Sequence, residues 1–285
     1  MRCIMRYFKN QVTVSLKYIV MFGFGVFIGF VFSQDIDIND LLDRFEIHQD
    51  SKSLGQQTRT TSTNPTATEK PWMPKAISQI DRQGYSLSYD ARNKNPMWVY
   101  EDLTSDNLQG NVDRKDSAFK EDPIIPTIFR ATLSDYRSSG FDRGHMAPAA
   151  DHKSCPEAMS DTFFMSNMCP QCPQLNRGFW AKLEKHVRDL TKSNAHVYVI
   201  SGPLYLPKEG RDGKRYIKYQ VIGDNDVAVP THFFKVLHLE KSSGKIETQT
   251  FIVPNEPVAA DSSIDSFRVT IDKVERVAGL IFSSN

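Results

Sequence analysis

Residues 142–151 read DRGHMAPAAD, and the segments FMSN, LNRGFW and LE follow at residues 164–167, 175–180 and 183–184. A Ser/Gly turn at residues 138–140 precedes the first segment, so the polar side chains of residues 142–145 are held near a bend. From Asn176 to Leu190 apolar residues recur at helical intervals, with Lys and Arg between them. This part of the chain therefore predicts a polar segment next to a turn, followed by an amphipathic helix.

Four polar residues of this stretch suit the chemistry of phosphate diesters. The imidazole of His145 can accept a proton from water near neutral pH, and Arg143 can brace a phosphate with two hydrogen bonds. Asn176 and Glu184 lie two turns apart on the expected helix, about 80° round its axis, so both could face one cleft. A structural interpretation stays open, in which Asn176 caps the helix and Glu184 is a solvated charge.

The rest of the chain beyond residue 75 has a mixed pattern. Helical periodicity is clearest at residues 176–190 and returns from Asp272 to about Ile281. Strands are expected at residues 85–89, 97–101, 196–201, 216–222, 232–239 and 248–253. Strands, one prominent helix and then further strands indicate an α+β domain with an antiparallel sheet.

The N-terminal segment, residues 1–34, is expected to be a targeting or membrane-anchor segment. Four basic residues precede an apolar run at residues 18–32, and no acidic residue occurs before Asp35. A cleaved secretory signal is the rival interpretation. Residues 35–74, rich in Ser, Thr, Gln and Asn, are expected to form a flexible linker, and residues 75–285 the folded domain.

Charge does not decide whether this domain binds a polyanion. Residues 76–285 hold 26 Lys and Arg against 27 Asp and Glu, so no global basic field exists. If the domain binds a nucleic acid, a local cluster of Lys or Arg side chains must contact the phosphates.

Together these segments resemble the DNA/RNA non-specific endonuclease family, most closely its endonuclease G type. The resemblance extends from about Tyr85 to Leu280 and is densest between residues 142 and 190. Further matches are DRK at residues 113–115, SGPLY at 201–205 and VPTHFFK at 229–235. The similarity implies a ββα-metal (His-Me finger) catalytic core within the α+β domain.

The resemblance also implies roles for individual residues. His145 would be the general base, Asn176 the direct ligand of Mg²⁺, with Mn²⁺ as a substitute, and Glu184 a group that orients metal-bound water. Asn167 would help to position the site. The residues implied to contact substrate phosphates and stabilise their charge are Arg114, Arg143 and Arg177. The products would carry 5′-phosphate ends, and both DNA and RNA would be substrates.

The family resemblance further implies a homodimer and a place in the cell. A mitochondrial enzyme of this type would lie at the inner membrane or in the intermembrane space, held by its N-terminal segment. A bacterial enzyme would instead be periplasmic or secreted.

Three other interpretations of the sequence remain. A phosphodiesterase of the same fold could act on a smaller diester, and a nucleic-acid-binding or uptake protein could retain only vestigial catalysis. A thiol protein could use Cys169 and Cys172, whose spacing is that of a redox or zinc half-site. This third interpretation lacks the usual βαβ setting and leaves the longer motif unexplained.

Overall fold

The computed structural model describes residues 79–259 and 261–282. The compact unit to which they belong extends over Pro71–Asn285. Within the two described ranges, no helix is both long enough and apolar enough for a membrane span. The anchor expected at residues 1–34 and the linker expected at residues 35–74 lie outside the described residues.

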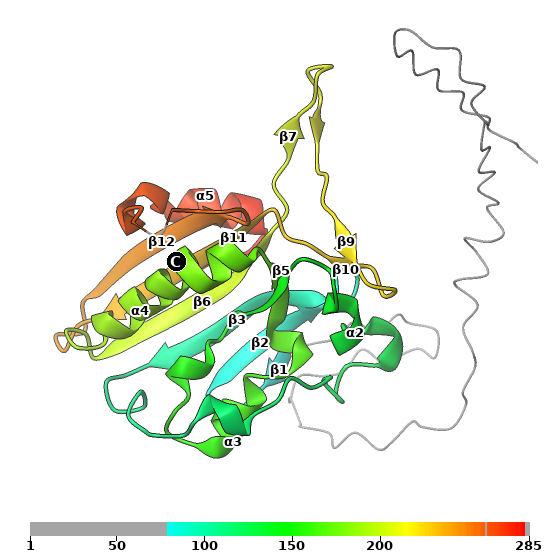
Figure 1. Cartoon of the computed structure of the whole chain (residues 1–285). Coiled ribbons are helices and arrows are strands. Elements are labelled where there is room, and N and C mark those ends of the chain that lie inside the picture. Colours follow the sequence, from blue (N-terminus) through cyan, green and yellow to red (C-terminus); the bar gives the residue numbers. More distant parts are fainter. Residues whose placement is uncertain (1–78, 260, 283–285) are drawn as a thin grey trace, which may run out of the picture. The chain divides into compact units, whose positions relative to one another are not determined.

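A six-stranded antiparallel sheet forms the centre of the domain (Figure 1). Its strand order is β1-β2-β3-β6-β11-β12, and every neighbouring pair runs antiparallel. The strands are β1 (Gln79–Asp81), β2 (Tyr85–Asp90), β3 (Asn95–Leu103), β6 (His196–Leu204), β11 (His232–Glu240) and β12 (Ile246–Pro254). The expected α+β class with an antiparallel sheet is confirmed.

Helices pack on both faces of this sheet because its central strands are apolar on both faces. On β11, Phe233 belongs to the core cluster that includes Val187 of α4 (Ala181–Leu190). The next residue, Phe234, packs with Val274 of α5 (Ile271–Ala278), since successive strand residues point to opposite faces. Helix α5 ends before residue 281 because Gly279 adopts a left-handed conformation that closes it.

A separate two-stranded sheet contains the DRGH segment at residues 142–145. Strand β4 (Asp142–His145) pairs antiparallel with β5 (Met168–Gln171). A π-helical turn at Leu175–Trp180 then leads directly into α4. Short helices occupy the connections: η1 (Arg114–Asp116), η2 (Thr127–Phe129), α2 (Leu133–Tyr136), η3 (Ala149–Asp151), α3 (Pro156–Asp161), η4 (Met165–Asn167) and η6 (Ile264–Phe267).

The prediction of one continuous strand at residues 216–222 is wrong. Its ends belong to separate two-residue strands, β8 (Arg215–Tyr216), which pairs with β7 (Lys208–Glu209), and β9 (Val221–Ile222), which pairs with β10 (Val227–Ala228). Figure 1 shows the β7–β8 hairpin projecting from the body of the domain. Residues 211–221 are all exposed, so their β-forming side chains have no sheet surface to pack against.

Candidate active site

The β4–β5 pair places Arg143 and His145 on the same face of a strand. Gly144 lies between them and pairs with Cys169. A Cβ atom at residue 144 would come within 2.1 Å of the side-chain oxygen of Gln171, so only glycine fits there without movement. The motif thus needs glycine at its third residue to bring the two strands together.

Asn167 fixes the backbone that follows His145. Its side chain is fully buried; its Oδ1 accepts a hydrogen bond from the N–H of Ala147 at 2.9 Å. Its Nδ2 donates to the carbonyl oxygens of Ala147 and Thr162, each at 2.9 Å. Asn167 is therefore a positioning residue that acts through the loop after His145, and it does not line the pocket.

Asn176 does not cap the helix, contrary to one interpretation of the sequence. Its backbone N–H already donates to the carbonyl of Cys172 at 2.8 Å, and Gln174 before it is helical. The side-chain Nδ2 donates to Oδ2 of Asp142 at 2.8 Å. This bond leaves the Oδ1 of Asn176, which has no hydrogen-bond partner among the described residues, as a free acceptor.

Asp142, the first residue of the motif, was not expected to have a role. Besides Asn176, it accepts hydrogen bonds from Nη2 of Arg177 at 2.6 Å and from Nε at 2.8 Å. Although burial opposes the effect, the hydrogen bonds from Arg177 and Asn176 hold the pKa of this carboxyl below its usual value. Asp142 stays ionised and orients both neighbouring side chains.

The imidazole of His145 is neutral at physiological pH. Its ring lies 5.1 Å from that of Phe163 and 5.5 Å from that of Phe119, between ring centroids. Burial lowers the pKa of His145 to about 3, with further contributions from the positive charges of Arg114 and Arg143. Its Nε2 has no hydrogen-bond partner among the described residues.

Glu184 lies on α4, and its carboxyl interacts electrostatically with the buried Lys235. It is therefore not the solvated charge of the structural interpretation. Burial raises the pKa of its carboxyl to about 8, while the positive charge of Lys235 opposes this rise. Lys235 is itself buried on β11, where its Nζ donates to Oγ of Ser201 at 2.6 Å and lies 5.0 Å from the ring centre of Trp180.

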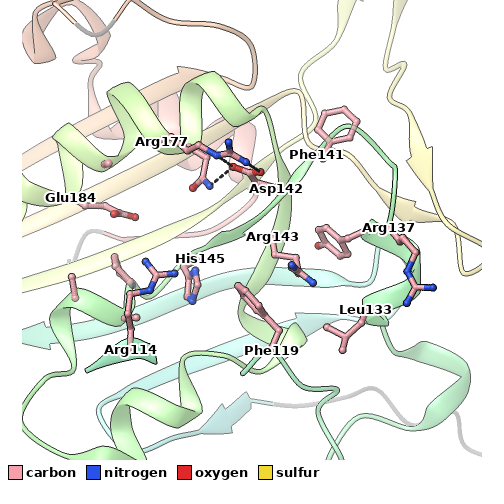
Figure 2. A pocket seen from close by; sticks show the side chains of 16 residues that line it. Arg114, Phe119, Leu133, Arg137, Phe141, Asp142, Arg143, His145, Arg177 and Glu184 are labelled. Atoms are coloured by element: carbon pink, nitrogen blue, oxygen red, sulfur yellow. Dashed lines mark hydrogen bonds and ion pairs between the residues drawn. The ribbon is translucent and has the colours of Figure 1, made fainter. Parts of the chain in front are cut away.

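A pocket of about 760 Å³ brings most of these residues together (Figure 2). Six of the seven residues that the sequence assigned to the site line it, the exception being Asn167. They are Arg114, Arg143, His145, Asn176, Arg177 and Glu184. The pocket is also lined by residues that the sequence interpretation missed, among them Phe119, Leu133, Tyr136, Arg137, Phe141 and Asp142.

The side-chain oxygens in the pocket are suitable ligands for a divalent cation that keeps most of its water molecules. No group of three or more His, Cys, Asp or Glu side chains among the described residues could hold a metal ion. The amide oxygen of Asn176 and the carboxylate of Glu184 are hard oxygen donors, which suit Mg²⁺ with its retained waters. Cys169 and Cys172 are buried free thiols in the core, which gives the thiol-protein interpretation no support.

Comparison with known proteins agrees with this arrangement. Residues 64–285 match the family model described as DNA/RNA non-specific endonuclease. Human "Endonuclease G, mitochondrial" is 49% identical over 213 residues, which are 75% of this chain and 72% of that protein. The "Mitochondrial nuclease" of Saccharomyces cerevisiae is 43% identical over 234 residues, 79% of this chain and 71% of that protein.

A solved structure is similar too. The crystal structure of an EndoG/EndoGI complex contains a chain 46% identical to this one, with a TM-score of 0.71, covering 74% of this chain and 87% of that chain. Together, the match over residues 64–285, the relatives and the geometry of the pocket show that this chain belongs to the DNA/RNA non-specific endonuclease family and is a hydrolase of nucleic acids.

Proposed function

We propose that this nuclease cuts DNA and RNA internally with His145 as the general base, leaving 5′-phosphate and 3′-hydroxyl ends. The observation that carries the proposal is the pocket itself. It combines a neutral imidazole, two arginines, Arg114 and Arg143, that form no ion pair among the described residues, an oriented amide oxygen and a carboxyl group. This is the set of groups that hydrolysis of a phosphate diester by an activated water requires.

His145 is in the correct protonation state to accept a proton from water. Burial holds its pKa low in the free enzyme, and the positive charges of Arg114 and Arg143 lower it further. A bound phosphate diester brings a negative charge to these arginines and offsets their effect on the imidazole. The basicity of His145 therefore rises when substrate is present, which favours proton transfer at that moment.

Arg114 and Arg143 bind the phosphate and stabilise the charge that develops on it. None of the ion pairs among the described residues involves either guanidinium. Aromatic rings hold them instead, with Arg143 4.3 Å from the centre of Phe119 and Arg114 5.9 Å from that of Phe163. Their N–H groups are thus left for phosphate oxygens. Arg177 shares its charge with Asp142 and contributes less.

Asn176 and Glu184 would hold a divalent cation, for which Mg²⁺ is the proposed species and Mn²⁺ a substitute. When bound, such a cation supplies positive charge for the phosphate and the departing 3′ oxygen. Asp142 keeps the amide of Asn176 in the orientation that presents its oxygen. Glu184 supplies a carboxyl group from α4 to the same pocket.

The same site accepts both sugars because His145 takes its proton from water and needs no ribose 2′-hydroxyl. The arginines contact phosphates, which carry no base information, so sequence selectivity is low.

We infer a mitochondrial location, which the names of the human and yeast relatives and the basic, apolar N-terminal segment support. Attachment of that segment to the inner membrane, with the nuclease domain in the intermembrane space, and assembly into a homodimer belong to the same proposal.

The test is nicking of plasmid DNA and degradation of RNA by the wild type, by His145→Ala and by His196→Ala, each with Mg²⁺ and with EDTA. His196 is a partly exposed histidine on β6, paired with Asp102 and outside the pocket, and serves as the control. We expect metal-dependent cleavage of both substrates, a loss of about 10²–10⁴-fold for His145→Ala, and no loss for the control. Equal cleavage by His145→Ala would overturn the assignment of the base.

A further inference from the structure

The pocket extends well beyond the groups that cleavage uses. Its volume of about 760 Å³ equals that of about 25 water molecules at ~30 Å³ each. Figure 2 shows Arg114, His145 and Glu184 toward one end, and Leu133, Arg137 and Phe141 toward the other, with Arg143 and Phe119 between them. Cleavage of one phosphate diester accounts only for the first end.

Apolar and aromatic side chains form the walls of the second end. Leu133 is exposed to solvent at 37% of its surface, and Phe141 is partly buried. Tyr136 is only 6% exposed, and its hydroxyl has no hydrogen-bond partner among the described residues. A planar or apolar ligand group can pack on such walls, as nucleobases and sugars do on aromatic side chains.

Helix α2, which carries Leu133 and Tyr136, is held in place by hydrogen bonds within the protein. Thr132 and Asp135 form a capping box at the start of α2. Asp135 also accepts hydrogen bonds from the backbone and side chain of Asn225, at 3.0–3.2 Å. These hydrogen bonds fix the Asp135 carboxylate between the start of α2 and Asn225, and none of the ion pairs among the described residues joins it to Arg137.

Arg137 follows the last residue of α2. It is exposed, and no ion pair among the described residues includes it. By contrast, Arg130, seven residues earlier, lies close to Glu121 and donates to two backbone carbonyls. Arg137 thus presents an uncommitted guanidinium to the second end of the pocket.

We propose that this end is a second nucleotide subsite, in which Arg137 binds the phosphate next to the scissile one and Phe141 and Leu133 pack against the attached nucleoside. The subsite rests on the proposed function of the first end, and it explains how a domain with almost no net charge can hold a chain of nucleotides through a local cluster of arginines. It also gives the enzyme a preference for substrates with more than one phosphate.

The test uses thymidine dinucleotides that contain a single diester bond, without a terminal phosphate, with a 5′-phosphate, or with a 3′-phosphate. Only one bond can be cut in each, so the effect of the additional phosphate is read directly. We expect one of the two phosphorylated forms to have a KM about tenfold lower than the plain dinucleotide in the wild type. In Arg137→Ala this gain should shrink to less than twofold, with kcat on the plain dinucleotide unchanged.

The control is Arg92→Ala, because Arg92 is also exposed and has no ion pair among the described residues but lies outside the pocket. It should keep the full gain. Equal KM values for all three dinucleotides in the wild type, or a gain that survives in Arg137→Ala, would overturn the subsite.

Binding without cleavage separates the subsite from the proposed function. In EDTA, the affinity of the same three dinucleotides is measured by competition with a fluorescent oligonucleotide. Arg137→Ala should abolish the tenfold advantage of the phosphorylated form here too, whether or not the protein cuts any substrate. For the longer oligonucleotide, the slope of log affinity against log salt concentration should be smaller in magnitude by about 0.7 in Arg137→Ala than in the wild type. An unchanged advantage in EDTA would refute the subsite on its own.

Discussion

Replacing Asp142 with alanine separates the orientation of Asn176 from its presence. In the wild type, Oδ2 of Asp142 accepts from Nδ2 of Asn176 at 2.8 Å, so the amide oxygen of Asn176 points elsewhere. Without the carboxylate, the amide can rotate by half a turn and exchange its oxygen for its NH₂ group. The proposed cation would then face a donor in place of a ligand.

The expected magnitude follows from the kind of bond that is lost. A hydrogen bond to a charged group contributes about 1.5–3 kcal/mol, which corresponds to roughly 10–100-fold in affinity. Loss of an outer-shell partner of a metal ligand typically costs the same factor. Stability should change less, because Arg177, the other partner of Asp142, has a side chain that is 73% exposed.

The assay is cleavage of plasmid DNA as a function of Mg²⁺ concentration. For Asp142→Ala we expect the half-saturating Mg²⁺ concentration to rise by about 10–100-fold, with most of kcat regained at saturation. Asp189→Ala is the control, since Asp189 pairs with Lys185 and Lys192 on the surface of α4 and should not alter the titration. An unchanged Mg²⁺ requirement in Asp142→Ala would refute the orienting role.

Three further predictions concern pH and stability. At saturating Mg²⁺, which favours the ionised form of Glu184, the acid limb of kcat/KM should lie well below pH 6.5, because the pKa of His145 is lowered to about 3 and this group stays neutral through the weakly acidic range; a limb at 6.5 would contradict the account. The folded-state pKa of Glu184 is raised from 4.5 to about 8, so its carboxyl destabilises the metal-free fold increasingly as pH rises from 4.5 to 8. Glu184→Gln should therefore gain on the order of 1–3 kcal/mol over the wild type in urea unfolding at pH 8.5 and almost nothing at pH 4; equal gains would argue against burial as the cause. Asn167→Ala should lower the free energy of unfolding by about 2–4 kcal/mol, because it leaves the N–H of Ala147 buried and unpaired; a loss below 1 kcal/mol would show that the loop rearranges.

Hydrophobic alternation predicted the large sheet well, except where strands are short or lack a packing surface. β11 and β12 were found because apolar residues alternate along them and face α4 and α5. β4 was expected only as part of the ββα core that the family resemblance implies, since DRGH has no apolar alternation and forms a strand by pairing with β5. The strand expected at residues 216–222 failed for the opposite reason, because the β-forming residues between 216 and 221 are exposed to solvent.

The candidate site was predictable where its residues lie within the motif. Arg143, His145, Asn176 and Glu184 come from two adjoining segments, and their residue types alone suggest the chemistry. Arg137 and Tyr136 were missed because their position beside the pocket depends on how α2 is held against residues 223–226, which no local pattern reveals. The role of Asp142 depends equally on a contact 34 residues away in the chain.

The charges in the pocket are mismatched until both the cation and the phosphate are present. Arg114, Arg137 and Arg143 have no carboxylate partner among the described residues. The raised pKa of Glu184 and the lowered pKa of His145 favour the uncharged forms of these two side chains. A divalent cation favours the ionised form of Glu184, and a phosphate diester compensates the arginines. Each ligand should therefore bind more tightly when the other is present, and by linkage the two enhancements must be equal. Calorimetry with Ca²⁺ as a non-cleaving substitute and a short oligonucleotide should show at least about fivefold mutual enhancement. Independent binding would mean that the arginines and the carboxyl group respond to separate ligands, and that the pocket does not function as a single electrostatic unit.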